Sequence, residues 1–150
     1  MTEALLQINH LSRSFGGLKA VEDVTLSVPQ GSLTALIGPN GAGKTTLFAL
    51  MSGFLTPDVG RVHFAGQDIT GQAPHRNARA GLARTFQIVQ PFAAQTVREN
   101  IAVGAHLRLP GRAAALAAAD AVAQRLGLTA LLDPPAGEAS DTLRQAYLGL

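Results

Sequence analysis

Hydrophobic and polar residues follow different spacings along the first third of the chain. Residues 5–8 are strand-like, and residues 24–28 alternate apolar and polar positions as a half-buried strand does. Residues 33–37 form a nearly continuous apolar run, which predicts a buried strand. The apolar residues 47–51 predict the first turns of a helix. The segment between them is rich in glycine, so the pattern predicts a strand, a tight loop and a helix in that order.

The middle of the chain continues with short elements. Residues 61–65 alternate and predict a strand, and residues 66–68 (Gly-Gln-Asp) predict a hairpin turn after it. A short helix is expected to start after Pro74, followed by a strand or extended segment over residues 82–86.

Helical spacing dominates the second half. Val97, Ile101 and Ala105 share one helical face, and the Pro-Gly pair at residues 110–111 breaks that helix. A second helix is expected over residues 113–126, before a glycine. The composition changes near residues 87–91, from mixed α/β to all-helical.

The glycine-rich loop has the spacing G-x-x-x-x-G-K-[ST]. This is the P-loop pattern, and a strand before it with a helix after it is the context in which the pattern acts as a phosphate cradle. Glycines let the backbone turn tightly and bring its N–H groups close to phosphate oxygens. The helix N-terminus adds a partial positive charge at the same place. The nucleotide-binding residues are then predicted to be Gly38, Pro39, Asn40, Gly41, Ala42, Gly43, Lys44, Thr45 and Thr46.

Two side chains of this loop have specific predicted roles. Lys44 should reach the β- and γ-phosphates of ATP, and the Thr45 hydroxyl should ligate Mg²⁺. The alternative is a glycine-rich turn between a strand and a helix, with a solvated lysine.

Composition narrows the choice of partners. The chain of 150 residues is 47% hydrophobic but only 15% charged, which leaves apolar material for a core and for a surface covered by a partner. A formal charge of +2 without a basic run argues against nucleic acid. The chain has no cysteine, its N-terminus is not that of a signal peptide, and no apolar stretch approaches the length of about 20 residues that spans a bilayer.

Several segments together resemble the ATP-binding subunit of an ABC transporter, in the variant of the branched-chain amino-acid importers. They follow the P-loop at residues 52–61, 64–70 (Phe-Ala-Gly-Gln-Asp-Ile-Thr), 81–87 (Gly-Leu-Ala-Arg-Thr-Phe-Gln) and 96–101 (Thr-Val-Arg-Glu-Asn-Ile). Arg-Thr-Phe-Gln is a particular mark of the branched-chain type. The likeness runs from near Leu6 to about Leu128.

The resemblance implies a fold and a division of the chain. The fold would be an α/β P-loop NTPase of ABC type, with an N-terminal antiparallel β part and an all-α subdomain after the Q-loop. Residues 1–90 would form the nucleotide-binding core, and residues 91–150 a partial helical subdomain with a divergent tail. The sheet would be incomplete in this chain.

The resemblance also implies site residues and partners. Gln87 would contact Mg²⁺ and the attacking water, which makes Lys44 and Gln87 the expected catalytic pair. Phe15 would stack on adenine, although a lone phenylalanine is as often part of a core. Residues 88–106 would meet transmembrane permease subunits at the cytoplasmic face of the plasma membrane. A second ATP-binding subunit would complete the ATP sites.

The sequence also departs from the family pattern. The glycine-rich signature loop, the apolar strand ending in Asp-Glu (Walker B) and the switch histidine are absent. Residues 139–145 align with a degenerate signature, while residues 146–149 (Ala-Tyr-Leu-Gly) align with a C-terminal tail of the subfamily, and the sequence does not decide between the two. We expect a truncated or shortened form that binds nucleotide weakly and hydrolyses it poorly.

Two other functional classes stay open at this point. One is a non-catalytic nucleotide-binding module that docks on a membrane partner and binds ATP without hydrolysis. The other is a different P-loop enzyme, such as a small-molecule kinase, against which the segments at residues 84–87 and 96–100 argue. The transported solute cannot be deduced from the sequence.

Overall fold

The computed structural model describes residues 4–137 of the chain. The chain packs into two compact units, Met1–Arg84 and Thr85–Leu150, and each is described by itself. The division of function between residues 1–90 and 91–150 stays a prediction.

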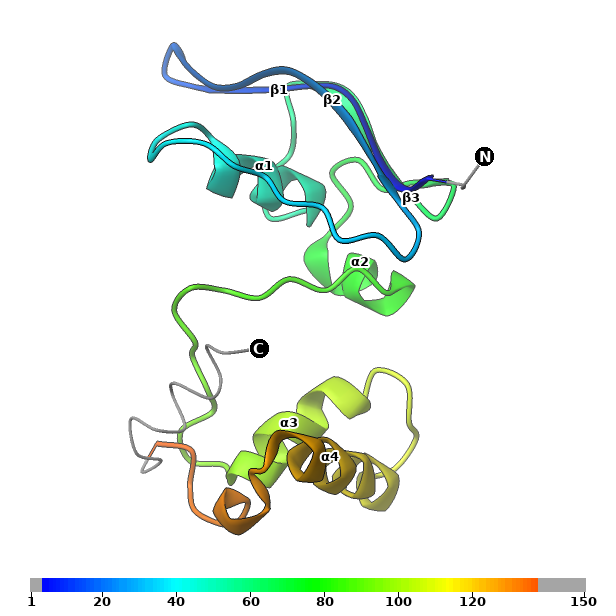
Figure 1. The fold of residues 1–150 in the computed structure, drawn as a ribbon, viewed down its shortest axis with the longest axis vertical. Helices are drawn as coiled ribbons and strands as arrows, with labels where there is room; N and C mark the ends of the chain where they lie inside the picture. Colours follow the sequence, from blue (N-terminus) through cyan, green and yellow to red (C-terminus); the bar gives the residue numbers. More distant parts are fainter. Residues whose placement is uncertain (1–3, 138–150) are drawn as a thin grey trace. The chain divides into compact units, whose positions relative to one another are not determined.

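An antiparallel sheet forms the base of the first unit. Its strands are β1 (Ala4–Phe15), β2 (Leu18–Pro29), β3 (Val59–Phe64) and β4 (Gln67–Asp68). They lie in the order β2-β1-β3-β4, with every neighbouring pair antiparallel. The first three strands are labelled in Figure 1. The strands predicted at residues 5–8 and 24–28 fall inside β1 and β2, which pair with each other along a long hairpin.

The hairpin between β3 and β4 turns one residue earlier than predicted. Ala65 and Gly66 both have a positive φ, of 48° and 76°, and they make the turn. Gln67 and Asp68 consequently belong to β4, where they pair with Phe64 and His63. The sequence pattern placed Ala65 in the strand because its methyl group continues the alternation, but backbone geometry decides the turn.

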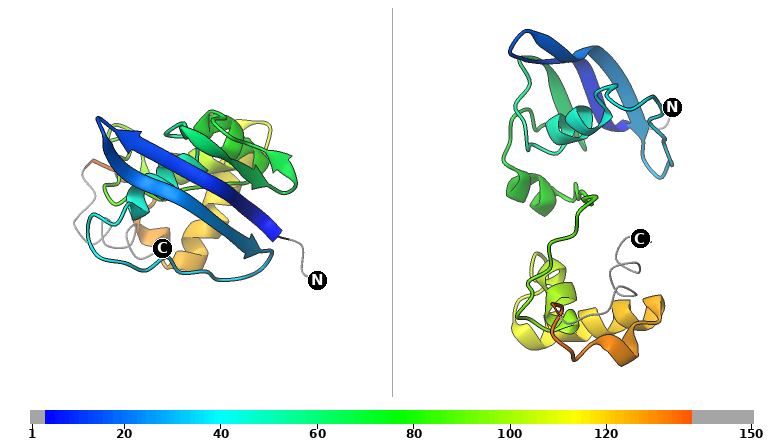
Figure 2. Two further views of the ribbon diagram at one scale, coloured as in Figure 1. Left: turned by 90° about the horizontal axis from the view of Figure 1, so that it is seen from above. Right: turned by 90° about the vertical axis from the view of Figure 1, so that its left-hand side faces the viewer.

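The core of the first unit forms where helix α1 (Lys44–Met51) packs on the sheet (Figure 2). The helix predicted from residues 47–51 is thus confirmed. One side of α1 is buried, while Phe48 on its other side is exposed. The core is made of Ile8, Leu11, Val21, Leu47, Leu50, Met51, Val62 and Ile69.

The buried strand predicted at residues 33–37 is not present. These residues adopt no regular secondary structure, and Leu33 and Ile37 are 102% and 91% exposed. A strand of a parallel sheet forms only when neighbouring strands hydrogen-bond to its edges, and its side chains are buried because helices cover both faces of the sheet. Within residues 4–137 no strand pairs with this segment. An apolar sequence supplies the tendency to be buried but not the partners, and the sheet is incomplete as expected.

The first unit ends with a short helix. Helix α2 (Pro74–Ala80) begins at Pro74, where the missing N–H costs nothing because the first turn has no intrahelical partner for it. Gly81 closes the helix in the left-handed conformation, and residues 82–86 have no regular secondary structure. The predicted short helix is confirmed, while a strand over residues 82–86 is not present.

The second unit contains the two predicted helices. Helix α3 (Val97–Ala105) starts with a capping box, in which Thr96 and Glu99 each accept a hydrogen bond from the other's backbone N–H. Helix α4 (Arg112–Leu126) buries three alanines against α3 and is followed by a 3₁₀ turn, Thr129–Leu131. Among the described residues, no helix is long and apolar enough to cross a bilayer.

Ionised Asp68 should stabilise the first unit at neutral pH, and this stabilisation should be lost in acid. Hydrogen bonds from the Thr70 side chain and backbone N–H, and then the Arg61 guanidinium, lower the pKa of Asp68 from 3.8 to about 2. Because the folded pKa lies below the unfolded one, the stabilisation is complete above pH 3.8 and is lost as pH falls through about 2. We expect Asp68→Asn to lower the urea midpoint at neutral pH.

The pH series provides the check. Urea midpoints of the wild type and Asp68→Asn should converge as pH falls from 3.8 toward 2. A difference that stays constant over this range would contradict the assignment.

Candidate functional site

The predicted P-loop leads into α1 through Gly43, a position at which no other residue type fits. Gly43 has φ 81° and directly precedes Lys44, the first residue of the helix. A Cβ at Gly43 would lie 2.1 Å from the carbonyl oxygen of Ala20 in β2, much closer than any real contact. Glycine is therefore required here both by backbone conformation and by the approach of the loop to the sheet.

The N-terminus of α1 is open to an anion. It has no side-chain cap and no acidic residue in its first turn, and the first intrahelical contact of the loop is the bond from the Leu47 N–H to the Gly43 carbonyl, 2.8 Å. N–H groups at such an end point outward with a partial positive charge, which suits phosphate oxygens.

Lys44 folds back onto its own loop. Its Nζ donates to the carbonyl oxygens of Gly38 and Pro39, both at 2.6 Å. The ammonium group is therefore already positioned at the loop, where phosphate oxygens would take over the role of the carbonyls. Thr45 lies exposed on the first turn of the helix, one residue further on.

The residues present fit Mg-ATP. Lys44 supplies a cation at the loop, the helix end supplies N–H donors, and the exposed Thr45 hydroxyl is an oxygen ligand of the kind that Mg²⁺ accepts together with phosphates. The individual contacts with nucleotide stay predictions.

Phe15 ends β1 beside this loop. It pairs with Leu18 at the closed end of the hairpin, and Ala20, two residues further along β2, is the residue that Gly43 approaches. The Phe15 ring is 42% exposed, which is compatible with a surface for a base rather than a place in the core. Its role in adenine stacking stays a prediction.

Sequence reasoning missed Arg13. Its guanidinium carbon lies 5.0 Å from the centroid of the Phe15 ring, and its Nη1 donates to Asp58 Oδ1 at 2.6 Å. Asp58 is 45 positions away in the sequence, and nothing in the local pattern marks the pair. Only the pairing of β1 with β3 brings Asp58 to this place.

Gln87 belongs to the second unit and is exposed. Its predicted contact with Mg²⁺ and water stays a prediction. The alternatives for the tail, residues 139–145 and 146–149, lie outside the described residues.

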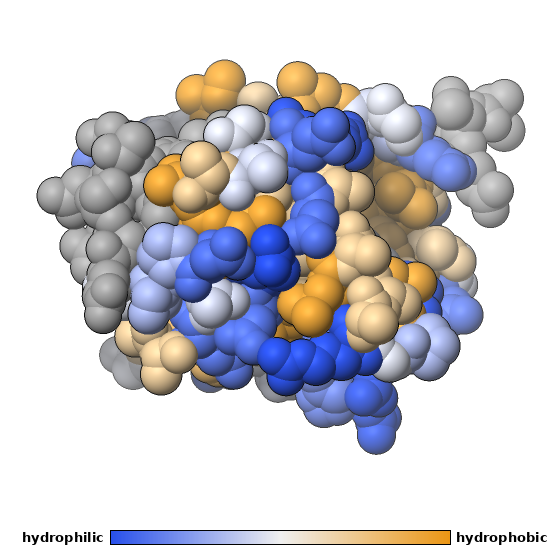
Figure 3. All heavy atoms as spheres, turned by 90° about the horizontal axis from the view of Figure 1, so that it is seen from below, coloured by the Kyte–Doolittle hydropathy of each residue, from blue (hydrophilic) through white to orange (hydrophobic). Residues whose placement is uncertain are grey.

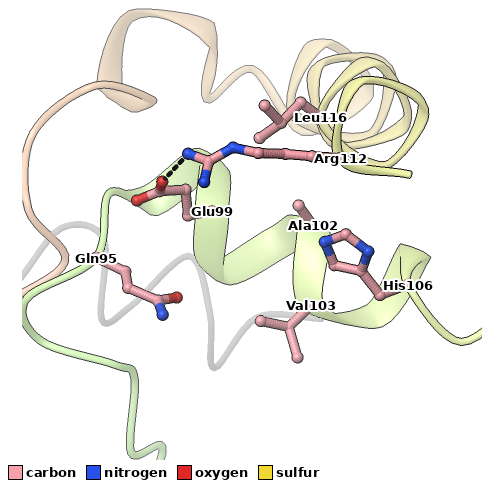
Figure 4. A pocket seen from close by; sticks show the side chains of 7 residues that line it. All are labelled: Gln95, Glu99, Ala102, Val103, His106, Arg112 and Leu116. Atoms are coloured by element: carbon pink, nitrogen blue, oxygen red, sulfur yellow. Dashed lines mark hydrogen bonds and ion pairs between the residues drawn. The ribbon is translucent and has the colours of Figure 1, made fainter. Parts of the chain in front are cut away.

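The second unit contains a hollow of about 290 Å³ between α3 and the start of α4 (Figure 4). Arg112 Nη2 and Glu99 Oε1 form an ion pair across it at 2.6 Å. The backbone N–H of Thr96, then its hydroxyl and the Arg112 guanidinium, lower the pKa of Glu99, so its carboxylate is charged at neutral pH. The hollow is lined by Gln95, Glu99, Ala102, Val103, His106, Arg112 and Leu116.

Exposed hydrophobic residues precede α3 in the same unit. Ile88, Val89 and Phe92 are exposed, and the Asn100 side chain bonds both the N–H and the carbonyl of Phe92, at 2.8 and 3.1 Å. The backbone at Phe92 is thus held while its ring faces solvent. On the face drawn in Figure 3, hydrophobic and hydrophilic residues lie interspersed.

The fold and the loop define a P-loop nucleotide-binding protein with an appended helical unit. The family model described as "ABC transporter" matches residues 21–146, so the chain belongs to the ABC transporter family. The resemblance deduced from the motifs is confirmed.

Relatives place the chain near one branch of this family. It is 50% identical over 99 residues to the "Probable branched-chain amino acid transport ATP-binding protein LivG" of Archaeoglobus fulgidus, covering 66% of this chain and 38% of that protein. It is 43% identical over 109 residues to the high-affinity LivG protein of Escherichia coli, covering 73% and 43%. The chain spans about two fifths of the length of these curated relatives.

Solved structures agree on the fold. The ADP conformation of MJ1267, an ATP-binding cassette of an ABC transporter, is 33% identical and has a TM-score of 0.80, covering 99% of this chain and 64% of that one. The predicted fold class, a partial P-loop NTPase of ABC type, is confirmed.

Gly41 and Gly43 allow the effect of a steric clash to be measured apart from the effect of a positive φ. Gly41 and Gly43 have nearly equal φ, 82° and 81°, but a Cβ at Gly41 would meet nothing within 4 Å. We expect Gly43→Ala to cost about 1–3 kcal/mol more than Gly41→Ala, because only the first clashes with the Ala20 backbone. Urea denaturation of both variants checks this, and equal losses would mean that the loop does not rest on β2.

Proposed function

We propose that the protein binds Mg-ATP at the P-loop as the ATP-binding subunit of an ABC importer of the branched-chain amino-acid type. The observation that carries the proposal is the conformation of residues 38–46, in which Gly43 brings the open end of α1 against β2 with Lys44 at the loop. The names of the relatives support the branch of the family, but the solute is a proposal by likeness only.

The proposal assigns separate roles to the backbone N–H groups, to Lys44, to Thr45 and to Gln87. N–H groups of the loop and of the α1 end hold phosphate oxygens, and Lys44 exchanges the carbonyls of Gly38 and Pro39 for the β- and γ-phosphates. Thr45 offers its hydroxyl to Mg²⁺, which neutralises phosphate charge when bound. Gln87 would position the attacking water.

The proposed partners are transmembrane permease subunits and a second ATP-binding subunit, with the protein at the cytoplasmic face of the plasma membrane. Two features of residues 88–106 support a docking role. Phe92 is exposed on a held backbone, and five of the seven residues that line the hollow beside α3 lie in this range.

For the 150-residue chain acting alone, binding with little hydrolysis is the second candidate. It is favoured by one sequence observation: no apolar segment after Gln87 ends in Asp-Glu, the pair that would supply a second-shell magnesium ligand and a carboxylate near water. Phosphate release from ATP by the chain alone, measured under conditions of saturating nucleotide, distinguishes this candidate from an active ATPase.

Lys44→Ala is the test of the proposed function. We expect it to abolish measurable Mg-ATP binding, a loss of about tenfold or more, because a charged donor to two phosphates is removed. Titration calorimetry on the full chain measures this.

Arg79→Ala is the matched control. Arg79 is an exposed cation in the last turn of α2, so its removal changes net charge equally without touching the loop. Unchanged binding in Lys44→Ala would reject the P-loop as the nucleotide site.

Phe92→Ser tests the docking surface. We expect it to reduce copurification with coexpressed cognate permease subunits, because an exposed aromatic anchor is lost while the Asn100 bonds to the backbone remain. Val122→Ser, an exposed apolar residue of α4, is the control. Equal recovery of the permease with both variants would contradict the role of Phe92.

A further inference from the structure

We propose that Arg13 is a positioning residue for the nucleotide base, which acts by fixing the ring of Phe15 and is itself fixed by Asp58. The inference rests on the proposed function, because it concerns the adenine end of the same site. It adds a specific requirement: base-dependent affinity should depend on a pair of charged residues that touch neither the phosphates nor the P-loop.

The Phe15 ring lies at the end of β1, next to two glycines that carry no side chain to pack against it. Gly16 and Gly17 follow it with φ of 51° and 87°, and apart from their own chain neighbours nothing lies within 4 Å of the position of a Cβ at either glycine. With 42% of its surface exposed, Phe15 is also outside the packed core. A ring in such surroundings would sample several orientations, and a base binds best to a ring already held in one.

Arg13 supports the ring. Its guanidinium lies over the ring, 5.0 Å from guanidinium carbon to ring centroid, which is the geometry of a cation–π contact. The ring is thereby held on one side and keeps exposed surface for a second planar group.

Asp58 fixes Arg13 in turn. Asp58 Oδ1 accepts from Arg13 Nη1 at 2.6 Å, and its Oδ2 accepts from the backbone N–H of Ser14 at 2.8 Å. The Asp58 N–H also donates to the Ser12 carbonyl at 2.9 Å. Three contacts therefore tie the residue before β3 to the last part of β1, on both sides of Arg13.

The Arg13 side chain has little other bonding in the described structure. It is 28% exposed, and its Nε is buried without a hydrogen-bond partner. One donor of the guanidinium therefore stays without an acceptor while the group stacks on the ring. We attribute this placement to the ion pair with Asp58, because a position chosen to satisfy all of its donors would not leave Nε unpaired. The chain of contacts runs from Asp58 through Arg13 to Phe15, and ends where the base is proposed to bind.

The experiment compares two ligands on the full chain: Mg-ATP, and Mg-tripolyphosphate, which has the phosphates but no base. We expect Arg13→Met, which keeps an apolar stem over the ring, to weaken Mg-ATP binding about two- to fivefold, the range of an exposed cation–π contact. Binding of tripolyphosphate should not change. Phe15→Leu should produce an ATP-specific loss of about fivefold or more, and adding Arg13→Met to it should produce no further loss.

Arg61→Met is the matched control. Arg61 pairs with Asp68 at 2.7 Å in the same unit, so this variant removes the same charge and the same kind of ion pair away from Phe15. If Arg13→Met does not fold by circular dichroism, Asp58→Asn tests the same chain of contacts, with a smaller ATP-specific loss expected.

Each result has a definite meaning. Equal loss for both ligands would show a general charge effect and overturn the inference, and so would no loss for either. Wild-type binding of both ligands with no effect of Phe15→Leu would overturn the inference while leaving the P-loop proposal intact. Absence of wild-type binding to either ligand would reject the proposed function itself.

Discussion

The packing of α1 on the antiparallel sheet is the interaction on which the first unit depends. Leu47 and Leu50 join the strand residues Ile8, Leu11 and Val62 in one core, and burial of each such side chain contributes about 1.5–3 kcal/mol. The same packing fixes the direction of the helix. At the N-terminus of α1, Gly43 approaches Ala20 of β2, so the predicted P-loop begins its helix beside that strand.

The parts of the structure that could be predicted are those determined locally. The helices at residues 97–105 and 112–126 follow from spacing, from a capping box and from glycine and proline at their ends. The start of α1 at Lys44, directly after Gly43, follows from the P-loop motif, which places a glycine-rich turn before a helix. The conformation of these elements depends little on residues that are distant in the sequence.

The features that the sequence did not predict have a common physical cause. Each of them depends on contacts with residues that are distant in the sequence. Residues 33–37 have the composition of a buried strand, but a strand forms only when other strands pair with it. The Asp58 contact with Arg13 joins residues 45 positions apart, through the register of β1 with β3. No local pattern contains either piece of information. The contacts of the Lys44 ammonium with carbonyls were missed for another reason, since the motif describes only the loaded loop.

Those carbonyl contacts have a consequence for which anions the loop can hold. Two neutral oxygens at 2.6 Å already accept hydrogen bonds from the ammonium group, which has three donors, so an anion that replaces them gains only the difference between its own attraction and theirs. A small monovalent ion such as chloride offers one diffuse charge and gives the loop N–H groups little in return. A polyphosphate presents several charged oxygens to the helix end and the lysine together. The carbonyl contacts of Lys44 therefore favour a polyphosphate over a small monovalent anion at this loop.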